Sequence, residues 1–232
     1  MPNSEDLNFD PSSFSGVARL FPLPNLVLFP HVMQPLHIFE PRYRAMAEEA
    51  VAGDQLITLS LLSPGWEKDY EGRPPLMPIA CLSRIATYQK LSDDRFNLLV
   101  LGLKRVRIVR ELPPNKLFRE AEVQVCEDVY PSATAPTRQG LQKELVDSFK
   151  QILPTLSDSQ EQVDDLLGSN VPLGVLTDIV SYTIDLGLPL KQQLLHEFNV
   201  DRRAALLVDY LQKGGNLRSH GRAGFPPEFS VN

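Results

Sequence analysis

The chain has 232 residues, of which 43% are hydrophobic and 22% charged, an ordinary composition for one large or two small globular domains. No stretch approaches the roughly 18 apolar residues needed to cross a bilayer, and the formal net charge of −6 argues against a general affinity for nucleic acid or anionic membrane. The acidic N-terminal segment has no basic region followed by an apolar core. We therefore expect a soluble, cytoplasmic protein.

The chain changes character near Pro131. Before it, runs rich in Val, Ile, Leu and Phe alternate with Pro and Gly, whereas after it apolar residues recur at helical spacing. The sequence therefore predicts an α+β fold, with a β-rich part over 17–130 and an α-helical bundle over 136–213. The polar ends, 1–16 and 214–232, are predicted to be flexible tails.

Short strands separated by turns favour a small barrel or sandwich in the β-rich part. In one of them, Val106 and Ile108 share one face and Arg105 and Arg107 share the other, so this strand is expected to bury only the aliphatic face. The predicted strands are 18–22, 55–62, 79–89, 96–103, 105–111 and 120–128.

One helix is predicted inside the β-rich part. Pro41 occupies its first position, where the missing N–H costs nothing, and Gly53 follows its end. Its buried face is expected to consist of Tyr43, Met46, Ala47, Ala50 and Val51.

Four helices are predicted after residue 136. Apolar residues at every fourth position from Leu141 to Leu153 predict an amphipathic helix that Pro154 ends. Pro172 and Pro189 begin the next two. Asp201 is predicted as the N-cap of the last helix.

The chain contains no phosphate-binding loop, dinucleotide-binding turn or local serine-nucleophile motif. Cys81 and Cys126 are too few for a disulfide framework or a four-thiolate zinc site, so both are interpreted as reduced, buried thiols. His37 and Glu40 could bring two metal ligands together, but a structural histidine is the preferred interpretation. We therefore expect no enzyme activity, no cofactor and no metal site.

The loop over 63–75 contains Trp66, the only tryptophan, and Tyr70. Aromatic residues on a loop are typical anchors of protein interfaces, so these two are candidate protein-binding residues. Alternatively, Trp66 folds back and plugs one end of the barrel. The sequence leaves both interpretations open.

Basic residues are frequent between Arg84 and Arg110. Arg105 and Arg107 are a candidate basic patch, and they are the sequence support for an RNA-binding alternative. The net negative charge and the scarcity of neighbouring aromatic residues favour a solvated strand face instead.

Two segments, 20–30 (LFPLPNLVLFP) and 34–44 (QPLHIFEPRYR), carry a family resemblance. Together with a Gly-x-x-Arg-x-x-Ile pattern at 102–108 and with 176–180, 191–195 and 200–203, they resemble the N-terminal domain of Lon proteases, a domain also found as a free-standing bacterial protein. The resemblance covers about 17–211. It departs at His31, where the family usually has Gly, and at Ala80-Cys81, where it often has Gly-Thr or Gly-Cys.

The resemblance implies a PUA-like β-barrel followed by a helical bundle. It also implies that the chain binds unfolded or exposed apolar polypeptide segments, with a separate protease or chaperone as a further partner. No catalytic residue is carried over, because the family's ATPase and protease activities reside in other domains. RNA binding by a PUA-like barrel is the alternative, although nucleic-acid and membrane partners are not expected.

The matching motif residues are predicted to have structural roles. Prolines stiffen the entry strands, and Phe29, Leu36 and Phe39 are expected to fill the barrel. Glu40 precedes the helix N-terminus, where its charge suits the helix dipole, and it is expected to pair with Arg42 or Arg44. The motif residues are Phe29, Pro30, Pro35, Leu36, Phe39, Glu40, Pro41, Arg42 and Tyr43.

Overall fold

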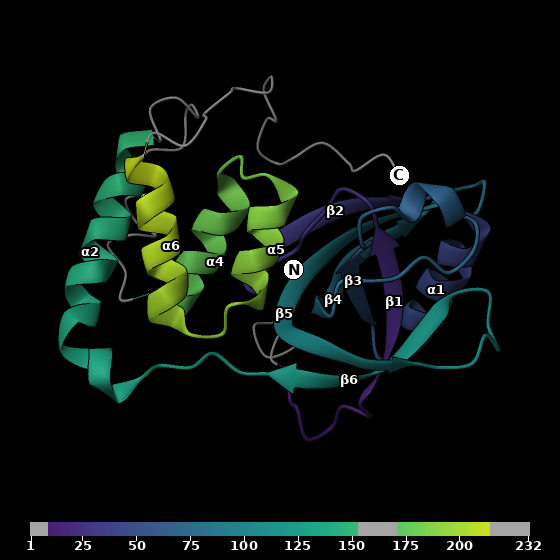
Figure 1. Ribbon diagram of the computed structural model, residues 1–232. Helices are drawn as coiled ribbons and strands as arrows, with labels where there is room; N and C mark the ends of the chain where they lie inside the picture. Colours follow the sequence, from purple (N-terminus) through teal and green to yellow (C-terminus); the bar gives the residue numbers. More distant parts are fainter. Residues whose placement is uncertain (1–8, 153–170, 214–232) are drawn as a thin grey trace. The chain divides into compact units, whose positions relative to one another are not determined.

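The computed structural model describes residues 9–152 and 171–213 (Figure 1). The chain divides between Cys126 and Glu127 into two compact units, called here the sheet unit and the helical unit. Because one unit is built around a mixed sheet and the other from helices, the fold is α+β. The predicted tail over 214–232 and the first eight residues of the other predicted tail lie outside the described residues.

Within the described residues the sheet unit contains six strands; β5, β4, β3, β1 and β6 close into a ring, and β2 adds an edge to it beside β5. Their order is β2-β5-β4-β3-β1-β6, and β5 pairs with β6 as well. β1 and β3 run parallel, whereas the other pairs are antiparallel. Because the register shifts along the β4–β5 and β5–β6 pairs, the closed sheet is not a regular barrel. The strands are β1 (Val17–Leu23), β2 (Met33–Ile38), β3 (Leu56–Leu61), β4 (Ile79–Lys90), β5 (Phe96–Glu111) and β6 (Arg119–Cys126).

β5 is a single strand of 16 residues, so the prediction of two separate strands there was wrong. Its first half pairs with β2 and its second half with β6, while β4 pairs with both halves. Gly102, near its middle, stays in the ladder opposite Ser83. A Cβ at this position would lie 2.0 Å from the carbonyl oxygen of Phe29, so glycine is required by a close backbone approach rather than by a strand end.

β2 was not predicted as a strand, because Pro35 interrupts its pattern. Proline is tolerated on an edge strand, where no ladder hydrogen bond is lost. In the described sheet β2 lies at the end of the strand order, and Pro35 pairs with Leu99 of β5.

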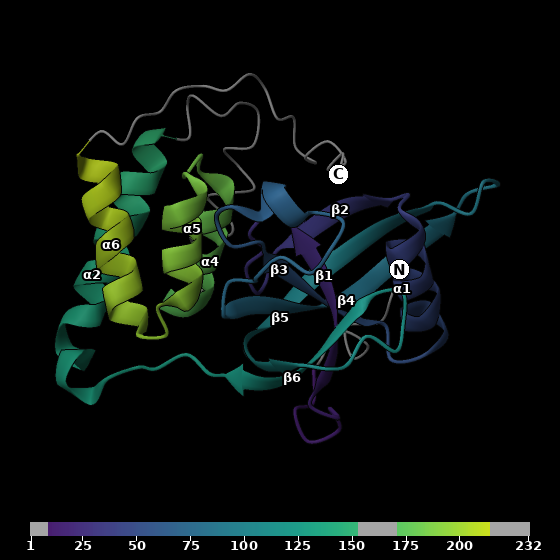
Figure 2. The same cartoon turned by 45° about the vertical axis from the view of Figure 1, so that its right-hand side comes forward.

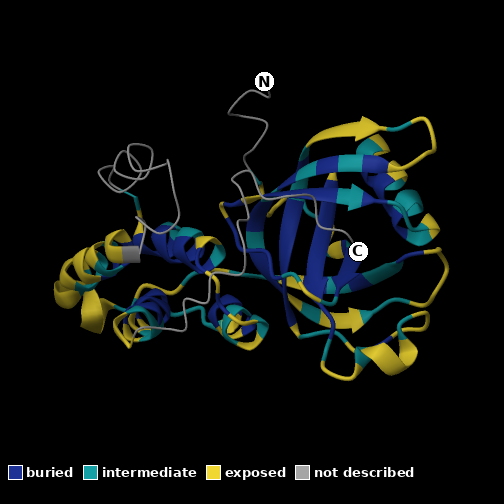
Figure 3. Ribbon diagram, turned by 90° about the horizontal axis from the view of Figure 1, so that it is seen from above, coloured by how far each residue is buried: buried dark blue, intermediate teal, exposed yellow. Residues whose placement is uncertain are grey.

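Buried residues line the strands of the sheet unit, whereas its connecting loops are largely exposed (Figure 3). One core cluster is formed by small and aliphatic side chains of β1, β3, β4, β5 and β6, among them Leu20, Leu82 and Val106. Phe9 and Phe14 pack against this cluster. Residues 9–16 therefore do not form the free tail that was predicted for them.

Helix α1 (Pro41–Ala52) follows β2 and confirms the prediction closely. Pro41 begins it, and Gly53 after its end donates its backbone N–H to the carbonyl of Ala50. Its buried residues are Tyr43, Met46, Ala47 and Ala50, and Val51 is half-buried.

The helical unit contains α2 (Ala135–Ile152), α4 (Leu173–Thr183), α5 (Leu188–His196) and α6 (Val200–Gln212) (Figure 2). α6 packs against α2 and α4, and α4 packs against α5. α2 buries Leu145 and Phe149 as predicted. It begins at Ala135, just before the predicted start of the helical part at 136, and the predicted stop at Pro154 lies outside the described residues. No helix in the described ranges is long and apolar enough to cross a membrane.

The predicted N-cap of α6 was wrong by two residues. Asn199 is the cap, and its side-chain oxygen accepts the N–H groups of Asp201 and Arg202 at 3.1 and 3.2 Å. Asp201 lies in the first turn, where its carboxylate accepts hydrogen bonds from Arg138 on α2. Both residues suit a helix start, so the sequence alone did not distinguish them.

Candidate functional site

The two ends of the loop between β3 and β4 are joined by backbone hydrogen bonds, and the chain turns at Gly65. The backbone N–H of Ser63 donates to the carbonyl of Pro75 at 2.8 Å, and Leu62 forms an antiparallel bridge with Leu76. Gly65 has a φ of 89°, in the left-handed region that glycine adopts without strain. It leads the chain into a short 3₁₀ helix, Trp66–Asp69.

The structure brings together the two aromatic residues that the sequence singled out on this loop. The rings of Trp66 and Tyr70 meet edge-to-face, with 5.5 Å between their centroids. Both side chains are half-buried, so Trp66 is neither fully exposed nor enclosed. This geometry suits an aromatic anchor, and the assignment to protein binding remains a prediction.

Tyr70 connects the loop to the start of α1. Its hydroxyl donates to Oε1 of Glu40 at 2.9 Å, while Nε of Arg42 donates to Oε2 of Glu40 at 2.9 Å. The Arg42 guanidinium lies over both the Tyr43 ring and the Tyr70 ring, at 4.7 and 5.0 Å from their centroids. Of the two predicted partners of Glu40, Arg42 is therefore the one it pairs with, and Arg44 pairs with Asp94.

The two tyrosine hydroxyls remain protonated donors near neutral pH. Burial raises the pKa of Tyr43 well above its ordinary value, and burial together with the hydrogen bond to Glu40 raises the pKa of Tyr70. The Tyr43 hydroxyl donates to the carbonyl of Pro22 at 3.4 Å. Both side chains thus hold fixed orientations at this end of the sheet unit.

A cavity with a volume of about 180 Å³ lies beside this cluster within the sheet unit. Its lining combines apolar residues with four cationic side chains, and one carboxylate, that of Glu71, accompanies them. The cations are Arg42, Arg73, Lys116 and Arg119, and the apolar and aromatic lining residues are Pro22, Tyr43, Leu62, Tyr70, Pro74, Pro114, Leu117 and Phe118.

One carboxylate outside the cavity lining holds two of these cations. Nε of Arg119 and Nη2 of Arg73 both donate to Oε2 of Glu111, at 2.9 and 2.7 Å. Burial works to raise the pKa of Glu111, but the hydrogen bonds from Arg119 and Arg73 outweigh it and hold the pKa below its usual range. Glu111 therefore stays charged and fixes both guanidinium groups near the cavity.

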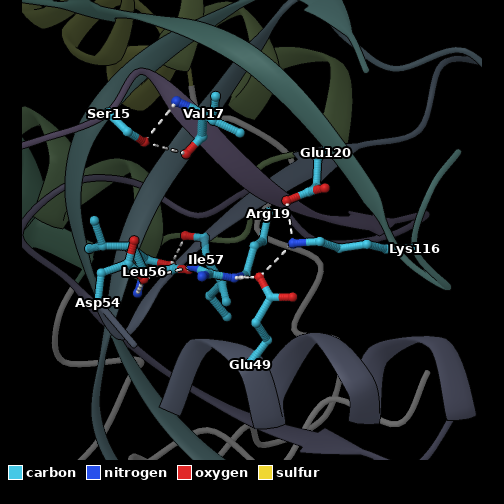
Figure 4. A network of polar contacts seen from close by, with 10 residues as sticks. Ser15, Val17, Arg19, Glu49, Asp54, Leu56, Ile57, Lys116 and Glu120 are labelled. Carbon is cyan, nitrogen blue, oxygen red and sulfur yellow. Dashed lines mark hydrogen bonds and ion pairs between the residues drawn. The ribbon is translucent and has the colours of Figure 1, made fainter. Parts of the chain in front are cut away.

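A second ion-pair network positions Lys116, as Figure 4 shows. Nζ of Lys116 donates to Glu49 of α1 at 2.8 Å and to Glu120 of β6 at 2.9 Å. Glu49 also accepts from Nε of Arg19 on β1 at 2.9 Å. Lys116 is thus held by α1, which is distant in sequence, and by β6, which follows it in the chain, while Arg19 of β1 holds Glu49.

The candidate basic patch is not assembled as predicted. Arg105 is only 3% exposed, so the expectation that it faces solvent beside the exposed Arg107 was wrong. Arg105 lies on the strand face opposite the core residue Val106, and that face is covered at Arg105 but open at Arg107. Other basic residues between Arg84 and Arg110 pair with carboxylates: Lys90 with Glu48, Arg95 with Asp93, and Arg110 with Glu122.

Most of the motif residues have the structural positions expected for them. Phe29, Pro30, Pro35 and Leu36 are buried, but Phe39 is only half-buried and does not fill the sheet interior as predicted. Its ring stacks on that of His37.

His37, for which a structural role was preferred over metal binding, and the two cysteines have ordinary structural surroundings. His37 makes a 2.7 Å hydrogen-bond contact between Nδ1 and the side-chain oxygen of Asn97, which agrees with a structural histidine. In the described residues no group of three His, Cys, Asp or Glu side chains is placed to hold a metal. Each cysteine thiol donates to a nearby backbone carbonyl, Cys81 to Leu82 and Cys126 to Gln124; Cys81 is buried as predicted, whereas Cys126 is only partly buried.

Of the four cationic residues of the cavity, sequence reasoning singled out Arg42 alone, as a motif residue, and did not find the other three. Arg73, Lys116 and Arg119 stand in proline-rich or strand segments without a recognisable motif. They meet only because β6 pairs with both β1 and β5. No local spacing signals such a set.

The fold has solved counterparts among the N-terminal domains of Lon proteases. The Lon N-terminal domain protein from Xanthomonas campestris aligns over 84% of this chain and 98% of its own, with a TM-score of 0.59 and 20% identity. The N-terminal domain of the Mycobacterium avium complex Lon protease aligns over the same shares, with a TM-score of 0.66 and 16% identity.

The family model of the ATP-dependent protease La (LON) substrate-binding domain matches residues 17–213. The chain therefore belongs to the Lon substrate-binding domain family, as its sequence motifs predicted.

Curated relatives are Lon proteases, and the chain spans about a quarter of their length. Lon protease 2 of Myxococcus xanthus is 26% identical over 197 residues, which are 85% of this chain and 24% of the relative. Lon protease of Anaeromyxobacter dehalogenans is 27% identical over 203 residues, which are 85% of this chain and 23% of the relative.

Proposed function

We propose that this protein is a non-catalytic polypeptide-binding module that recognises exposed apolar segments of unfolded proteins. The observation that carries the proposal is the match of 17–213 to a substrate-binding domain. The relatives' catalytic functions are not transferred, because the chain corresponds to about a quarter of their length. In this role it acts alone or as an adaptor for a separate protease or chaperone.

The loop carrying Trp66 and Tyr70 is the surface that we assign to this binding. Its two aromatic side chains are half-buried, held edge-to-face, and linked through Tyr70 to α1. A preorganised aromatic pair contributes contact area at low conformational cost. The loop therefore combines an apolar contact surface with a fixed shape.

Our proposal also includes a more specific description of the α+β fold. We infer that the closed sheet is a PUA-like barrel over 17–130 and that the helices form a bundle over 136–213. Both assignments follow from the family's known architecture, and an experimental structure of the whole chain would test them.

Binding of a fluorescently labelled, permanently unfolded protein tests the function. The whole chain is expected to bind it, and Trp66→Ala is expected to weaken binding by about tenfold, as for an interface anchor worth over 1 kcal/mol. Tyr88→Ala is the control, because Tyr88 is an aromatic on β4 that is 48% exposed. No affinity of the whole chain for unfolded proteins would contradict the proposal, as would degradation of casein by the purified chain with or without ATP.

A further inference from the structure

The cavity of the sheet unit presents two kinds of chemistry to a ligand. Arg73, Lys116 and Arg119 bring positive charge to its wall. Glu71 is the one carboxylate of the lining, while Glu111, Glu49 and Glu120, which hold the cations, are not part of it. Because carboxylates already hold these cationic side chains in place, little conformational entropy is lost when an anion binds to them. The wall is thus prepared for a negatively charged group.

Unused hydrogen-bond donors remain on two arginines of the lining, Arg42 and Arg73. Nη2 of Arg42 is buried and makes no hydrogen bond with a described residue, although it lies 2.8 Å from Oε2 of Glu40 as an ion pair. The hydrogen bonds of Arg73 to described residues both come from its Nη2, and its side chain is 36% exposed. A guanidinium group has five N–H donors, so further acceptors can be accommodated.

The apolar part of the lining points to the rest of the ligand. Leu62 and Phe118 are buried, whereas Leu117 is 74% exposed. An exposed leucine next to a partly apolar cavity is a place where an apolar group gains by burial. The ligand therefore carries an anion and an apolar group close together.

The size of the cavity limits what can enter. Its volume of about 180 Å³ is below the roughly 300–1,000 Å³ of pockets that enclose drug-sized molecules. One amino-acid residue fits this scale better than a folded element does. An Asp or Glu side chain would bring its carboxylate with few apolar atoms, whereas the last residue of a chain carries both a carboxylate and a side chain on one Cα.

We propose that this cavity binds the C-terminal residue of a polypeptide, with its carboxylate near Arg73 and Arg119 and an apolar side chain against Leu117 and Phe118. Capture of a C-terminal carboxylate is an established way for a protein to recognise peptides. The proposal rests on the polypeptide-binding function above and specifies the part of the polypeptide that is recognised, its C-terminal residue.

Fluorescence anisotropy with paired peptides tests it. Two peptides of the same sequence end in Leu, one with a free carboxylate and one with a C-terminal amide. The whole chain is expected to bind the free acid about tenfold more tightly, the change expected from one well-placed charge interaction. Arg73→Met is expected to reduce this difference to about twofold or less.

Arg110→Met is the matched control, because Arg110 is an exposed arginine paired with a glutamate, as Arg73 is, but it does not line the cavity. It is expected to leave the preference for the free acid unchanged. Equal binding of acid and amide by the wild-type chain would overturn the proposal, whatever the variants do. Equally tight binding of an amidated peptide with an internal Glu would also overturn it, since a side-chain carboxylate would then suffice.

The proposed function is measured separately with the unfolded protein. If the chain binds unfolded protein but does not distinguish acid from amide, the C-terminal proposal fails and the polypeptide-binding function stands. If it binds neither the unfolded protein nor the peptides, both fail.

Discussion

Arg203 on α6 and Asp128, which follows β6 in the chain, are joined by two parallel hydrogen bonds. Nη1 donates to Oδ1 at 2.9 Å and Nη2 to Oδ2 at 2.7 Å. The Arg203 side chain is fully buried, its Nε donates to the Thr177 hydroxyl at 2.7 Å, and it lies 3.7 Å from the buried Asp178 of α4. One arginine thus ties the first residues of the helical unit to two of its helices.

Replacing Arg203 by Met is expected to lower the free energy of unfolding by about 3–5 kcal/mol, because removing one member of a buried ion pair leaves its partners without their counter-charge. Urea unfolding followed by circular dichroism measures the change. Arg202→Met is the control, since Arg202 is exposed on the same helix, and a change within about 0.5 kcal/mol is expected there. Similar losses for both variants would show that the buried pair has no special role.

Gly102→Ala is expected to destabilise the chain by about 1–3 kcal/mol or more, since overpacking forces the backbone to shift. The new Cβ would lie 2.0 Å from the carbonyl oxygen of Phe29, which is backbone and cannot rotate away. Gly140→Ala is the opposite case, because at the exposed Gly140 on α2 an added Cβ would meet no described atom within 4 Å apart from its chain neighbours and its own helix backbone. That variant is expected to stabilise by about 0.5–1 kcal/mol. Thermal unfolding of both variants is compared with the wild type, and a stable Gly102→Ala protein would contradict the close approach.

His31→Gly is expected to stabilise the chain by about 0.5–1 kcal/mol. His31 has a φ of 66°, in the left-handed region that costs a non-glycine residue about 1–2 kcal/mol, which exceeds the added entropy cost of glycine. The substitution keeps the backbone N–H that donates to the carbonyl of Gly102 at 2.8 Å. His37→Gly in β2 is the control and is expected to destabilise by about 0.5–1 kcal/mol or more. A lower melting temperature for His31→Gly would mean that its side-chain contacts outweigh the strain.

Asp201 is expected to make part of the stability dependent on acidic pH. Hydrogen bonds from Arg138 and Thr134 lower the pKa of its carboxyl in the folded state. A lowered folded pKa stabilises the protein above the unfolded value of about 3.9 and ceases to do so as the pH falls through the folded pKa. The difference in unfolding free energy between wild type and Asp201→Asn should therefore shrink between about pH 5 and pH 3.

Urea unfolding at several pH values measures this difference. Asp209→Asn is the control at pH 7, since Asp209 lies on the same helix but is 59% exposed in its ion pair with Lys213, and a change below about 1 kcal/mol is expected. A difference for Asp201→Asn that does not vary with pH would show that the ionised carboxylate is not the stabilising form.

The sequence correctly predicted helices that can be recognised from a few consecutive residues. Pro41 and Gly53 bound α1, and the apolar spacing around Leu145 and Phe149 identified the buried face of α2. The same patterns did not show that β5 is continuous or that β2 exists, because Gly102 and Pro35 weaken a strand pattern wherever they occur. Their meaning depends on the neighbouring strands, and these are distant in sequence.

The sequence by itself determined the family, through the motif segments around Phe29 and Glu40, and it determined the α+β class through the change from strand to helix periodicity. Only the tertiary structure decided which charges are buried and which meet. Arg105 and Arg107 share a strand face in the sequence pattern, yet in the folded chain the first is buried and the second is exposed. Sheet closure gathers Arg73, Lys116 and Arg119 around one cavity, because strand pairing brings together residues whose separation along the chain carries no signal.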